Sequence, residues 1–578
     1  MKSKLTAILS ITLLLCGTPL LAQEYSGGEA DATETAPEPE IPQWLDGLRV
    51  FGMIRFRPQF ESNYDFDKTN DDVNEYVGSK LWLGVEKDFG DDVMAKILLQ
   101  DTRIWGGQPG SDTGLNTANN GTNEALDVRE AFIHIKDLVG PVDLRAGRQI
   151  MRYGDRRLVG NTDWNDVGRS FDGFRFMFDS KYFDSHLWGT VLGESDSGTG
   201  GNVTSVGSQN SSGFTTECDP VTGVCTLNAS TVQELDDGYF TGFYNTIKFG
   251  EWVHTELYYL GRHLKWKPAF NPVTFAPNAT VATQDRRQDR DNLHTFGSRI
   301  TNRTVSKGGR KVAVIPFDFT LEYAYQTGST GVRVDPDWDT AQVAVPVDPT
   351  LFNATNNNCQ GSFTNGSCRI YSEKQRYDAF AAVADAGYTI NDFVRIGAEY
   401  NVASGDPDRA DGAAATFNNL FPAAHYIWGI ADRTSWQNMI GRSINLQFFF
   451  GAFGTLRMAY WEVDKHTLQD AQYAVTTAPR NNLTTESREN ARFGDILDSS
   501  GNITSRAVAG LRQHLYKEYD IWYNIKYKGV DWEFGYSLIH AGDAVEEVLG
   551  DRRNVVWARE DKFDPTAHFA YLMMTYKF

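Results

Sequence analysis

The sequence lacks the long apolar runs and the excess of positive charge that two large classes of protein require. Mean hydropathy is −0.42, and only Leu5–Leu15 forms a sustained apolar run. A helical membrane protein needs runs of about 20 apolar residues, so helical spans are excluded from the rest of the chain. Lysine and arginine total 55 against 75 aspartates and glutamates, for a net charge of −20. Because nucleic-acid phosphates require a basic face, we expect no nucleic-acid partner.

Cysteine is also scarce, with five residues in 578. One of them, Cys16, lies close to the N-terminal apolar run. The other four form two closely spaced pairs, Cys218 with Cys225 and Cys359 with Cys368. Even, local pairing in an exported chain predicts two disulfides that close outer loops. Neither pair has the spacing of a zinc site, so we expect no metal.

Motifs of catalysis are absent as well. The ten histidines are scattered, and the sequence contains neither an HExxH nor a GxSxG motif. The run 406–412 (DPDRADG) lacks the fifth-position acid and the distal glutamate of an EF-hand. We therefore predict that the chain is not an enzyme and uses no cofactor.

The N-terminal segment has the features of an export signal. Residues 1–22 combine Lys2 and Lys4 with the apolar run and end in the small residue Ala22. These features predict a secretory signal peptide that is cut before Gln23. Residues 23–48 are rich in acids and contain no lysine or arginine. Such a composition cannot bury a core and predicts a flexible acidic periplasmic leader.

From residue 49 onward, short segments alternate apolar and polar side chains. In Val50–Phe60, one face holds apolar side chains such as Ile54, and the other holds charged ones such as Arg55. An apolar side chain at every second residue predicts a half-buried strand. In a membrane barrel the apolar face meets lipid and the polar face meets the lumen. About eighteen segments follow this pattern, among them 79–87, 93–100, 317–326, 394–402 and 518–527.

The connections between these segments alternate between short and long. Short turns occur at KDFGDD, DLVGPV, FGEW and KGVD, and long polar stretches such as 194–237 and 464–514 lie between them. This alternation predicts an all-β fold for residues 49–578, a transmembrane antiparallel β-barrel of about 18 strands with short periplasmic turns and long extracellular loops. The chain ends at Phe578, and a terminal aromatic residue resembles the signal that the outer-membrane assembly machinery recognises. We expect a monomeric barrel in the outer membrane of a Gram-negative cell, with membrane lipid and that machinery as partners.

The densest charge lies in Gly147–Arg175, which is predicted to be a loop between two strands. Six arginines stand among four aspartates there. Guanidinium groups offer fixed forks of donors that match either the protein's own carboxylates or those of a ligand. Two interpretations follow: an internal lattice of arginine and aspartate that makes the loop rigid, or arginines that face a water-filled lumen and meet anionic solute.

The stretch GRQIMRYGDRRLVGNTDWNDVGRSFDG from residue 147 and a second block at 404–438, SGDPDRADGAAATFNNLFPAAHYIWGIADRTSWQN, resemble the alginate export family of outer-membrane β-barrels. The resemblance implies a channel whose arginine-rich constriction attracts a polyuronate. Alginate exporters of this family carry a long periplasmic turn between the sixteenth and seventeenth strands that plugs the barrel. Here that turn is KGVD around Gly529, so we expect no gating by this element.

Strand parity and the arginine-rich loop together define the candidate lumen residues. Basic side chains are predicted on the first third of the wall and acids on the last two thirds, which would set up a field across the lumen. The residues predicted to line the pore and contact solute are Arg55, Arg57, Lys80, Lys96, Arg145, Arg148, Arg152, Arg156, Arg157, Arg169, Arg175 and Arg299.

The predicted function is therefore passive passage of anionic or sugar-acid solutes, with export of an alginate-like polyuronate as its polymeric form. Its solute partners would be small anions or an anionic polysaccharide. A general diffusion porin and a non-conducting surface adhesin or scaffold are the alternatives that the sequence leaves open.

Overall fold

The computed structural model describes residues 47–66, 73–105, 126–194, 215–218, 225–228, 235–266, 290–307, 310–334, 345–346, 367–368, 373–407, 412–423, 425–468, 470, 472–473, 496–497, 503–505, 512–545 and 563–578. The predicted signal peptide, the predicted leader up to residue 46 and Cys359 lie outside the described residues. Residues 47–578 form one compact unit, and it is the unit described below.

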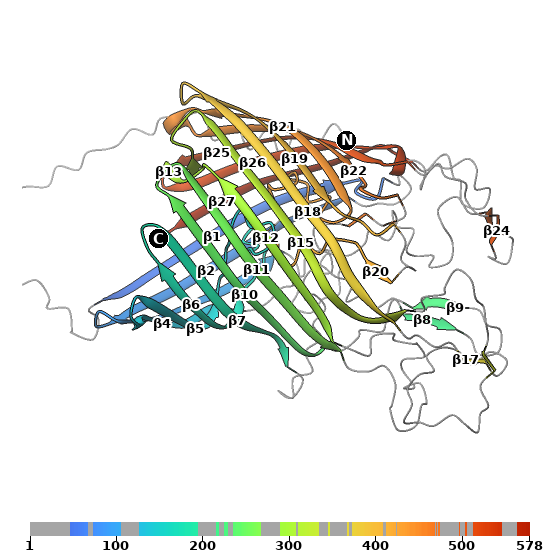
Figure 1. Ribbon diagram of the computed structural model, residues 1–578. Helices are drawn as coiled ribbons and strands as arrows, with labels where there is room; N and C mark the ends of the chain where they lie inside the picture. Colours follow the sequence, from blue (N-terminus) through green and yellow to red (C-terminus); the bar gives the residue numbers. More distant parts are fainter. Residues whose placement is uncertain are drawn as a thin grey trace, which may run out of the picture. The chain divides into compact units, whose positions relative to one another are not determined.

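Eighteen antiparallel strands of the described chain close into one barrel, as the sequence predicted (Figure 1). Each strand pairs with its neighbours in chain order, and the last strand returns to the first. The barrel begins one residue before the predicted 49. Its strands are β1 (Leu48–Ser62), β2 (Asn74–Phe89), β3 (Val93–Ile104), β4 (Asp127–Val139), β5 (Val142–Gln149), β6 (Phe171–Asp179), β7 (Phe183–Glu194), β10 (Leu235–Phe249), β11 (Val253–Trp266), β12 (Asp291–Thr301), β15 (Phe317–Val334), β18 (Glu373–Ile390), β19 (Val394–Ala403), β21 (Met439–Phe449), β22 (Thr455–Asp464), β25 (His514–Tyr527), β26 (Val530–Ala541) and β27 (Thr566–Lys577).

Short elements occupy the connections between the barrel strands. Strand β20 (Ala413–Ala414) adds to β18 in parallel. The other elements are the hairpins β8 (Thr215–Cys218) with β9 (Cys225–Asn228), β13 (Val305–Lys307) with β14 (Arg310–Val312), β16 (Val345–Pro346) with β17 (Ser367–Cys368), and β23 (Ile496–Leu497) with β24 (Ile503–Ser505), together with the 3-10 turn η3 (Gly451–Phe453). Among the described residues, no helix is long and apolar enough to cross a membrane.

The turns at one end of the barrel are short, as predicted, with one exception. Between β25 and β26 only Lys528 and Gly529 separate the strands, and Gly529 has φ +80, a conformation that glycine adopts without steric cost. The exception is residues 302–316 between β12 and β15, which carry the β13–β14 hairpin. No sequence pattern predicted this longer turn at the short-turn end.

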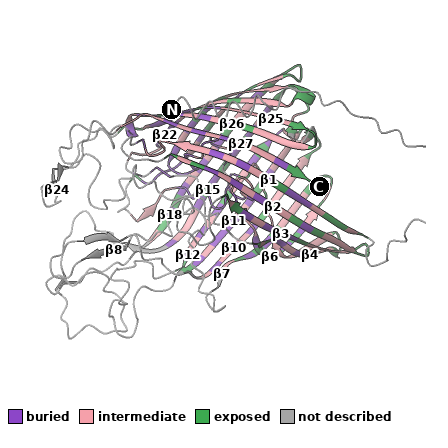
Figure 2. Cartoon of the chain, turned by 180° about the vertical axis from the view of Figure 1, so that it is seen from behind, coloured by how far each residue is buried: buried purple, intermediate pink, exposed green. Residues whose placement is uncertain are grey.

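The strands alternate side chains between an apolar outer face and a polar inner face. Val50 and Ile97 are 61% and 54% exposed on the outer face, whereas Arg57 and Lys80 are 2% and 1% exposed on the inner one. Figure 2 shows buried and exposed residues alternating along the strands. Outward apolar side chains and inward charged ones are the pattern of a barrel that sits in lipid.

The C-terminal residue takes part in closing the ring. The Gly52 amide on β1 donates to the Phe578 carbonyl at 2.8 Å, and the Phe578 amide donates to the Gly52 carbonyl at 3.1 Å. These two bonds continue the pairing of β27 with β1 to the end of the chain. No edge strand of the main barrel is therefore left unpaired within the described residues.

Candidate functional site in the barrel lumen

Two long connections fold into the barrel and meet there. They are residues 150–170, between β5 and β6, and the described residues of 404–438, between β19 and β21. Val159 and Phe421 form a parallel bridge between the two loops. The Gly160 amide also donates to the Phe421 carbonyl at 2.8 Å. The two sequence blocks that carry the family resemblance are thus in direct contact.

Contacts with widely separated strands show that the first loop lies inside the lumen. Arg55 on β1, Arg299 on β12 and Glu399 on β19 all bond to residues of 150–170. One loop can reach strands so far apart around a closed ring only through its interior. These contacts place the first loop inside the barrel.

A hydrophobic core joins the loops to the wall. Leu158 and Phe417 of the loops belong to one buried cluster with Trp188 on β7 and Phe240 on β10. The rings of Phe421 and Phe240 meet edge to face with centroids 4.7 Å apart. Burying a large apolar side chain contributes roughly 1.5–3 kcal/mol. The loops are therefore packed like a protein interior in this part of the lumen.

The predicted pore arginines on β1 hold the first loop by its backbone. Arg55 Nη1 donates to the Asp163 carbonyl at 2.7 Å, and Arg57 donates to the Trp164 carbonyl. Both guanidiniums also approach the Asp166 carboxylate at 3.2 Å. The guanidinium groups of Arg55 and Arg57 are buried and bonded to the loop, so these two arginines act as anchors that hold the loop against β1.

Asp163 is the centre of a second anchor. Its carbonyl accepts from Lys80 Nζ on β2 at 3.1 Å, and its carboxylate pairs with Arg129 on β4 at 2.8 Å and with Arg152 at 2.9 Å. An added Cβ at Gly168 would come within 2.4 Å of the Arg129 guanidinium, so Arg129 would have to shift to admit a larger residue there. Arg152 keeps a side chain that is 53% exposed.

A third ionic cluster ties the loop to the opposite wall. Arg157 pairs with Glu399 at 2.6 Å and with Asp155 at 3.2 Å. Arg299 pairs with Asp155 at 2.6 Å and with Glu256 at 2.8 Å. Burial acts to raise the pKa of Asp155, but the guanidiniums of Arg299 and Arg157 outweigh it and hold that pKa below the ordinary value. Asp155 is therefore a stable counter-charge at neutral pH.

Arg169 binds carbonyl groups rather than acids. Its Nη1 donates to the Gly160 carbonyl at 3.3 Å and to the Pro422 carbonyl at 2.8 Å. Burial, with a smaller contribution from the nearby Arg129 charge, lowers the pKa of Arg169 to about 10. It remains charged at neutral pH and links the two loops.

The second loop is held by two acids on β25. The Ala431 amide donates to Glu518 Oε1 at 3.0 Å, and the Ile430 amide donates to Asp520 Oδ2 at 3.3 Å. Gly429 has φ +96, and an added Cβ would come within 2.4 Å of Glu518. Glycine is therefore needed for the backbone to approach the carboxylate this closely.

An aromatic stack joins the tips of the loops on the β26 side of the lumen. Trp164 stacks on His425 with ring centroids 3.5 Å apart, and the Arg57 guanidinium lies 4.1 Å from the Trp164 ring centroid. The adjacent Tyr426 has φ +70, is exposed, and bonds through its hydroxyl to Glu533. None of these aromatic contacts could be predicted from the sequence, because they depend on loop geometry.

Arg145 and Arg175 differ from the anchoring arginines. They are directly opposite each other on β5 and β6, and both point inward. No carboxylate within the described chain forms an ion pair with either one. Arg145 lies 4.4 Å from the Phe132 ring centroid, and Arg175 is in hydrogen-bonding contact with Tyr153. Two like charges are thus held side by side on the lumen wall, and neither is in an ion pair with a described carboxylate.

Two further predicted residues occupy contrasting places. The alternation along β5 places Arg148 on the outer face, where it pairs with Asp172 at 3.2 Å and Asp127 at 3.9 Å. Its parity is opposite to that of Arg145, so it does not line the lumen. Arg156 is exposed on the first loop, has φ +65 and forms no ion pair with any described residue.

The predicted separation of charge across the lumen is only partial. Lys96 on the basic wall pairs with Glu130 at 2.7 Å. On the acidic wall, Asp318 pairs with Arg303 at 2.5 Å and with Arg395 at 2.7 Å. Neither arginine is among the residues predicted to contact solute. Compensation of this kind weakens a field between the two walls.

Arg129 was missed for a different reason. The register of β3 with β4 shifts between Leu98 and Leu99, which indicates a bulge at this point. A bulge places two consecutive residues on one face, and both Arg129 and Glu130 are buried on the inner side. Strict alternation assigned Glu130 alone to the lumen, and no sequence signal marks the bulge.

The backbone is consistent with one predicted cysteine pair. Cys218 and Cys225 are register partners in the β8–β9 hairpin. Cys368 pairs with Val345 in the β16–β17 hairpin, and Cys359 lies outside the described residues. Both disulfides remain predictions. Within the described ranges, no group of three or more His, Cys, Asp or Glu side chains is arranged to hold a metal ion.

The closed 18-stranded barrel, its polar inner face and the two inward loops are the features of an outer-membrane channel protein. The sequence profile of the alginate export family matches residues 48–559, and the chain belongs to that family. The resemblance found in the two sequence blocks is thereby confirmed.

Solved barrels of outer-membrane porins are similar in outline. Pseudomonas aeruginosa OccK8 (OprE) is 11% identical, with 93% of this chain and 99% of that chain covered and a TM-score of 0.48. Acinetobacter baumannii OccAB1 is 10% identical, with 94% and 99% covered and a TM-score of 0.48. P. aeruginosa OpdO is 9% identical, with 92% and 97% covered and a TM-score of 0.46. No curated protein matches the chain.

Proposed function

We propose that the protein is an outer-membrane channel for anionic solutes of the sugar-acid class. The observation that carries this proposal is the Arg145–Arg175 pair, two inward guanidiniums that form no ion pair with any carboxylate of the described residues. Like charges held side by side repel each other, and a passing carboxylate relieves that repulsion. A guanidinium also offers the paired donors that fit a carboxylate.

The position of the pair suits the first contact of a solute that enters from the periplasm. Arg145 is three residues after Val142, where β5 leaves the short turn. Arg156, exposed on the first loop and without an ion pair in the described chain, supplies a third positive charge. Orientation follows from the long loops, which face the cell exterior in outer-membrane barrels.

The outer face supports the membrane location. Ile97, Ile133 and Leu187 are between 50% and 54% exposed and point away from the lumen. A soluble protein rarely exposes so many large apolar side chains around its whole circumference. Lipid contact removes this apolar surface from water.

The loops favour monomers or short oligomers of sugar acid over a long polymer. Both loops pack into the lumen with buried ionic and hydrophobic contacts. A polyuronate chain would need a continuous path past these contacts, whereas a small solute needs only local gaps. Export of a polymer would therefore require the loops to move.

Planar bilayers test the proposal directly. The purified barrel is inserted, and the reversal potential is measured in a salt gradient, with glucuronate and glucose as competing solutes. We expect anion selectivity and block of small-anion current by glucuronate. The Arg145→Ser/Arg175→Ser double variant should lose most of the selectivity, because the unpaired charges are gone. Arg148→Ser, on the outer face of the same strand, is the matched control.

Three results would contradict the proposal. Equal selectivity in the double variant and the wild type would remove the role of the arginine pair. A wild type without ion preference would indicate a general diffusion porin. A folded, inserted barrel that conducts nothing would indicate an adhesin or scaffold.

A further inference from the structure

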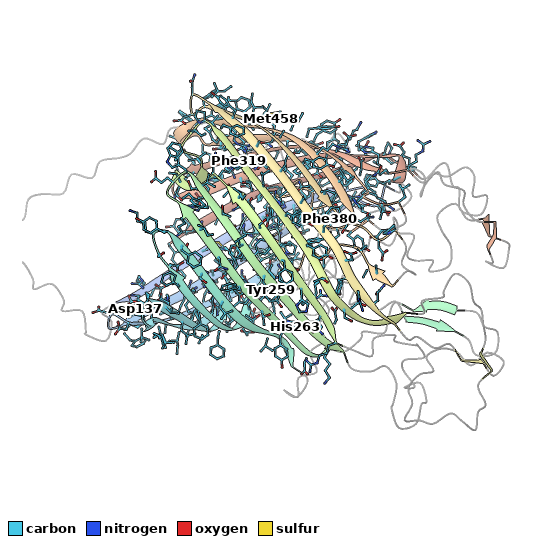
Figure 3. All side chains as sticks on the ribbon, in the orientation of Figure 1. Asp137, Tyr259, His263, Phe319, Phe380 and Met458 are labelled. Carbon is cyan, nitrogen blue, oxygen red and sulfur yellow. The ribbon has the colours of Figure 1, made fainter. Side chains whose placement is uncertain are left out.

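An arginine and a tryptophan lie side by side on the inner wall of the barrel, far along the ring from β5 and β6. Arg457 on β22 and Trp522 on β25 are register partners. Figure 3 labels Met458, the next residue on β22, which is 40% exposed on the outer face. Alternation therefore points Arg457 into the lumen, and Trp522 opposite it points the same way. Both side chains are only partly buried.

The charge of Arg457 forms no ion pair with any described carboxylate. Its Nη1 donates to the side-chain oxygen of Asn524, which follows Trp522 by two residues on β25. Its Nε and Nη2 have no hydrogen-bond partner within the described chain, and neither nitrogen is fully buried. These two nitrogens are therefore available to donate to a solute.

Tyr426 of the second loop is an exposed aromatic residue that the protein fixes in place near this pair. Its hydroxyl bonds to Glu533 and lies 3.3 Å from the Tyr571 hydroxyl, yet 38% of the residue is exposed. A left-handed φ of +70 is costly for so bulky a residue. Because much of the ring is uncovered, core packing recovers only part of that cost. Strained and fixed side chains of this kind gather at ligand sites.

Tyr426 and Trp522 together form an aromatic corner inside the barrel. Their ring centroids lie 6.1 Å apart, with the ring planes inclined by 33°. Trp522 packs against the buried cluster that contains Phe569 and Tyr571, which fixes its position. Its Nε1 has no hydrogen-bond partner among the described residues and is not fully buried. The corner thus offers apolar area with a polar group at its edge, as small-molecule sites do.

Glu533 does not occupy the arginine that a solute would use. Oε1 of Glu533 accepts from the hydroxyls of Tyr571, at 2.6 Å, and Tyr426, and Oε2 accepts from the Asn524 amide. Three neutral donors therefore satisfy this carboxylate. Arg457 contacts it only through Asn524, so the guanidinium keeps its free donors.

This arrangement matches a sugar acid in its ring form. A pyranose ring has C–H faces that pack on aromatic rings, and its hydroxyls need polar partners at the edge. A uronate adds a carboxylate, which fits a guanidinium. The aromatic corner, Trp522 Nε1 and Arg457 supply these three kinds of contact. An open-chain sugar acid lacks the rigid C–H face, and glucose lacks the carboxylate.

We propose that Arg457, Trp522 and Tyr426 form a subsite that selects the ring form of a sugar acid. The guanidinium binds the carboxylate, and the two aromatic rings pack against the sugar ring. This inference rests on the proposed function and adds a specificity to it. The Arg145–Arg175 pair attracts a carboxylate of any shape, whereas the aromatic corner distinguishes a ring from a chain.

Block of small-anion current in planar bilayers tests the subsite. The probes are glucuronate, its open-chain counterpart gluconate, uncharged glucose, and benzoate, which has a ring and a carboxylate but no hydroxyls. Trp522→Leu removes the aromatic face, and Arg457→Gln removes the charge while keeping a donor for Asn524. The matched controls are Trp532→Leu on the outer face of β26 and Arg442→Gln on the outer face of β21.

In the wild type, glucuronate should block at a lower concentration than the other three solutes. Trp522→Leu should raise the half-blocking concentration of glucuronate about tenfold, to the level of gluconate, and leave gluconate unchanged. Arg457→Gln should weaken the block by both sugar acids and leave glucose unchanged. Both controls should behave like the wild type, and every variant should keep the heat-modifiable migration of a folded barrel. If Trp522→Leu fails to fold, Arg457→Gln decides through the comparison of glucuronate with glucose.

Three results would overturn the subsite. The first is equal block of the wild type by glucuronate and gluconate. The second is a parallel loss of block by all solutes in a variant, which would mean a change in lumen shape rather than the loss of one contact. The third is stronger block by benzoate than by glucuronate, which would assign the corner to aromatic acids.

The subsite and the proposed function fail separately. A barrel that selects anions but does not distinguish ring from chain keeps the proposed function and loses the subsite. A barrel without anion selectivity, in which Trp522→Leu still weakens block by glucuronate alone, keeps the subsite and loses the proposed function. A folded wild type that conducts nothing overturns both.

Discussion

Two pairs of inward arginines in the same barrel differ in the groups that their guanidiniums contact. Arg55 and Arg57 on β1 are buried. They donate to the Asp163 and Trp164 carbonyls and to the Asp166 carboxylate. Arg145 and Arg175 lie on β5 and β6 with the same inward parity but form no ion pair with any described residue. The same residue type on the same face therefore serves either as an anchor for the loop or as a charge that has no ion pair with a described carboxylate.

The contrast arises from the course of the first loop. Residues 163–166 lie against β1 and β2, so the basic groups there meet carbonyls and acids. Near β5 and β6 the loop presents Tyr153, which offers a hydroxyl but no negative charge. An arginine on a lumen wall is available to solute only where the protein provides no counter-ion for it.

The largest effect is expected from removing an anchor. Arg57→Ala deletes the bond to the Trp164 carbonyl, the cation–π contact with the Trp164 ring and one partner of the buried Asp166. Breaking a buried ion pair from one side costs about 3–5 kcal/mol. We expect the free energy of unfolding, measured by urea titration in lipid vesicles, to fall by about that amount.

The control for this experiment is Arg103→Ala, which removes an exposed pair with Asp101 on the outer face. An exposed pair contributes about 0–1 kcal/mol. Similar losses in the two variants would mean that Arg57 is not an anchor. A fall in anion selectivity in a stably folded Arg57→Ala barrel would mean that Arg57 acts on passing anions rather than as an anchor.

An intermediate effect is expected from giving the free pair a counter-ion. Arg145→Asp places a carboxylate directly opposite Arg175, so the wall changes from two unpaired positive charges to one compensated pair. We expect the ratio of anion to cation permeability to fall about tenfold, which corresponds to about 1.4 kcal/mol. The reversal potential in a salt gradient measures this ratio.

Stability should respond in the other direction. Because repulsion between like charges is replaced by attraction, the unfolding free energy of Arg145→Asp should stay the same or rise. Arg148→Asp, on the outer face of the same strand, should leave selectivity nearly unchanged. An unchanged reversal potential in Arg145→Asp would show that solute does not pass this pair.

The smallest effect is expected at Arg156, which combines a free charge with a left-handed backbone. Its φ of +65 costs a residue with a side chain roughly 1 kcal/mol. Arg156→Gly relieves that cost and should raise the unfolding free energy by about 0.5–1 kcal/mol, whereas Arg156→Ala should not. Both variants should reduce anion selectivity slightly and equally. Equal stability in the two variants would argue against strain at this position.

Much of the wall could be predicted from the sequence, because strand parity is a local property. Arg55, Lys80, Arg145, Arg175 and Arg299 all lie on the inner face, as alternation predicted. The prediction for Arg148 came from the loop motif rather than from parity. Parity alone would have placed it outside, since it is three residues from Arg145. Arg129 was missed because a bulge interrupts the alternation.

The roles of the loop arginines could not be predicted in the same way. The sequence left two interpretations open for Gly147–Arg175, a rigid internal lattice or free charges in the lumen. The structure contains both. Arg157 and Arg169 are tied down by Glu399 and by the Pro422 carbonyl, residues more than 200 positions away. Arg156, next to Arg157, remains exposed.

The sequence by itself determined the barrel, because period-two alternation and alternating turn lengths act over a few residues and leave few other folds open. The tertiary structure alone decided which charges are free. An ion pair forms only when its two groups come within about 4 Å, and Glu399 and Asp166, which pair with Arg157 and Arg55, lie on another strand and in the first loop. Whether such a residue comes close to an arginine depends on how the two loops pack together inside the ring. No local pattern in the chain encodes that packing.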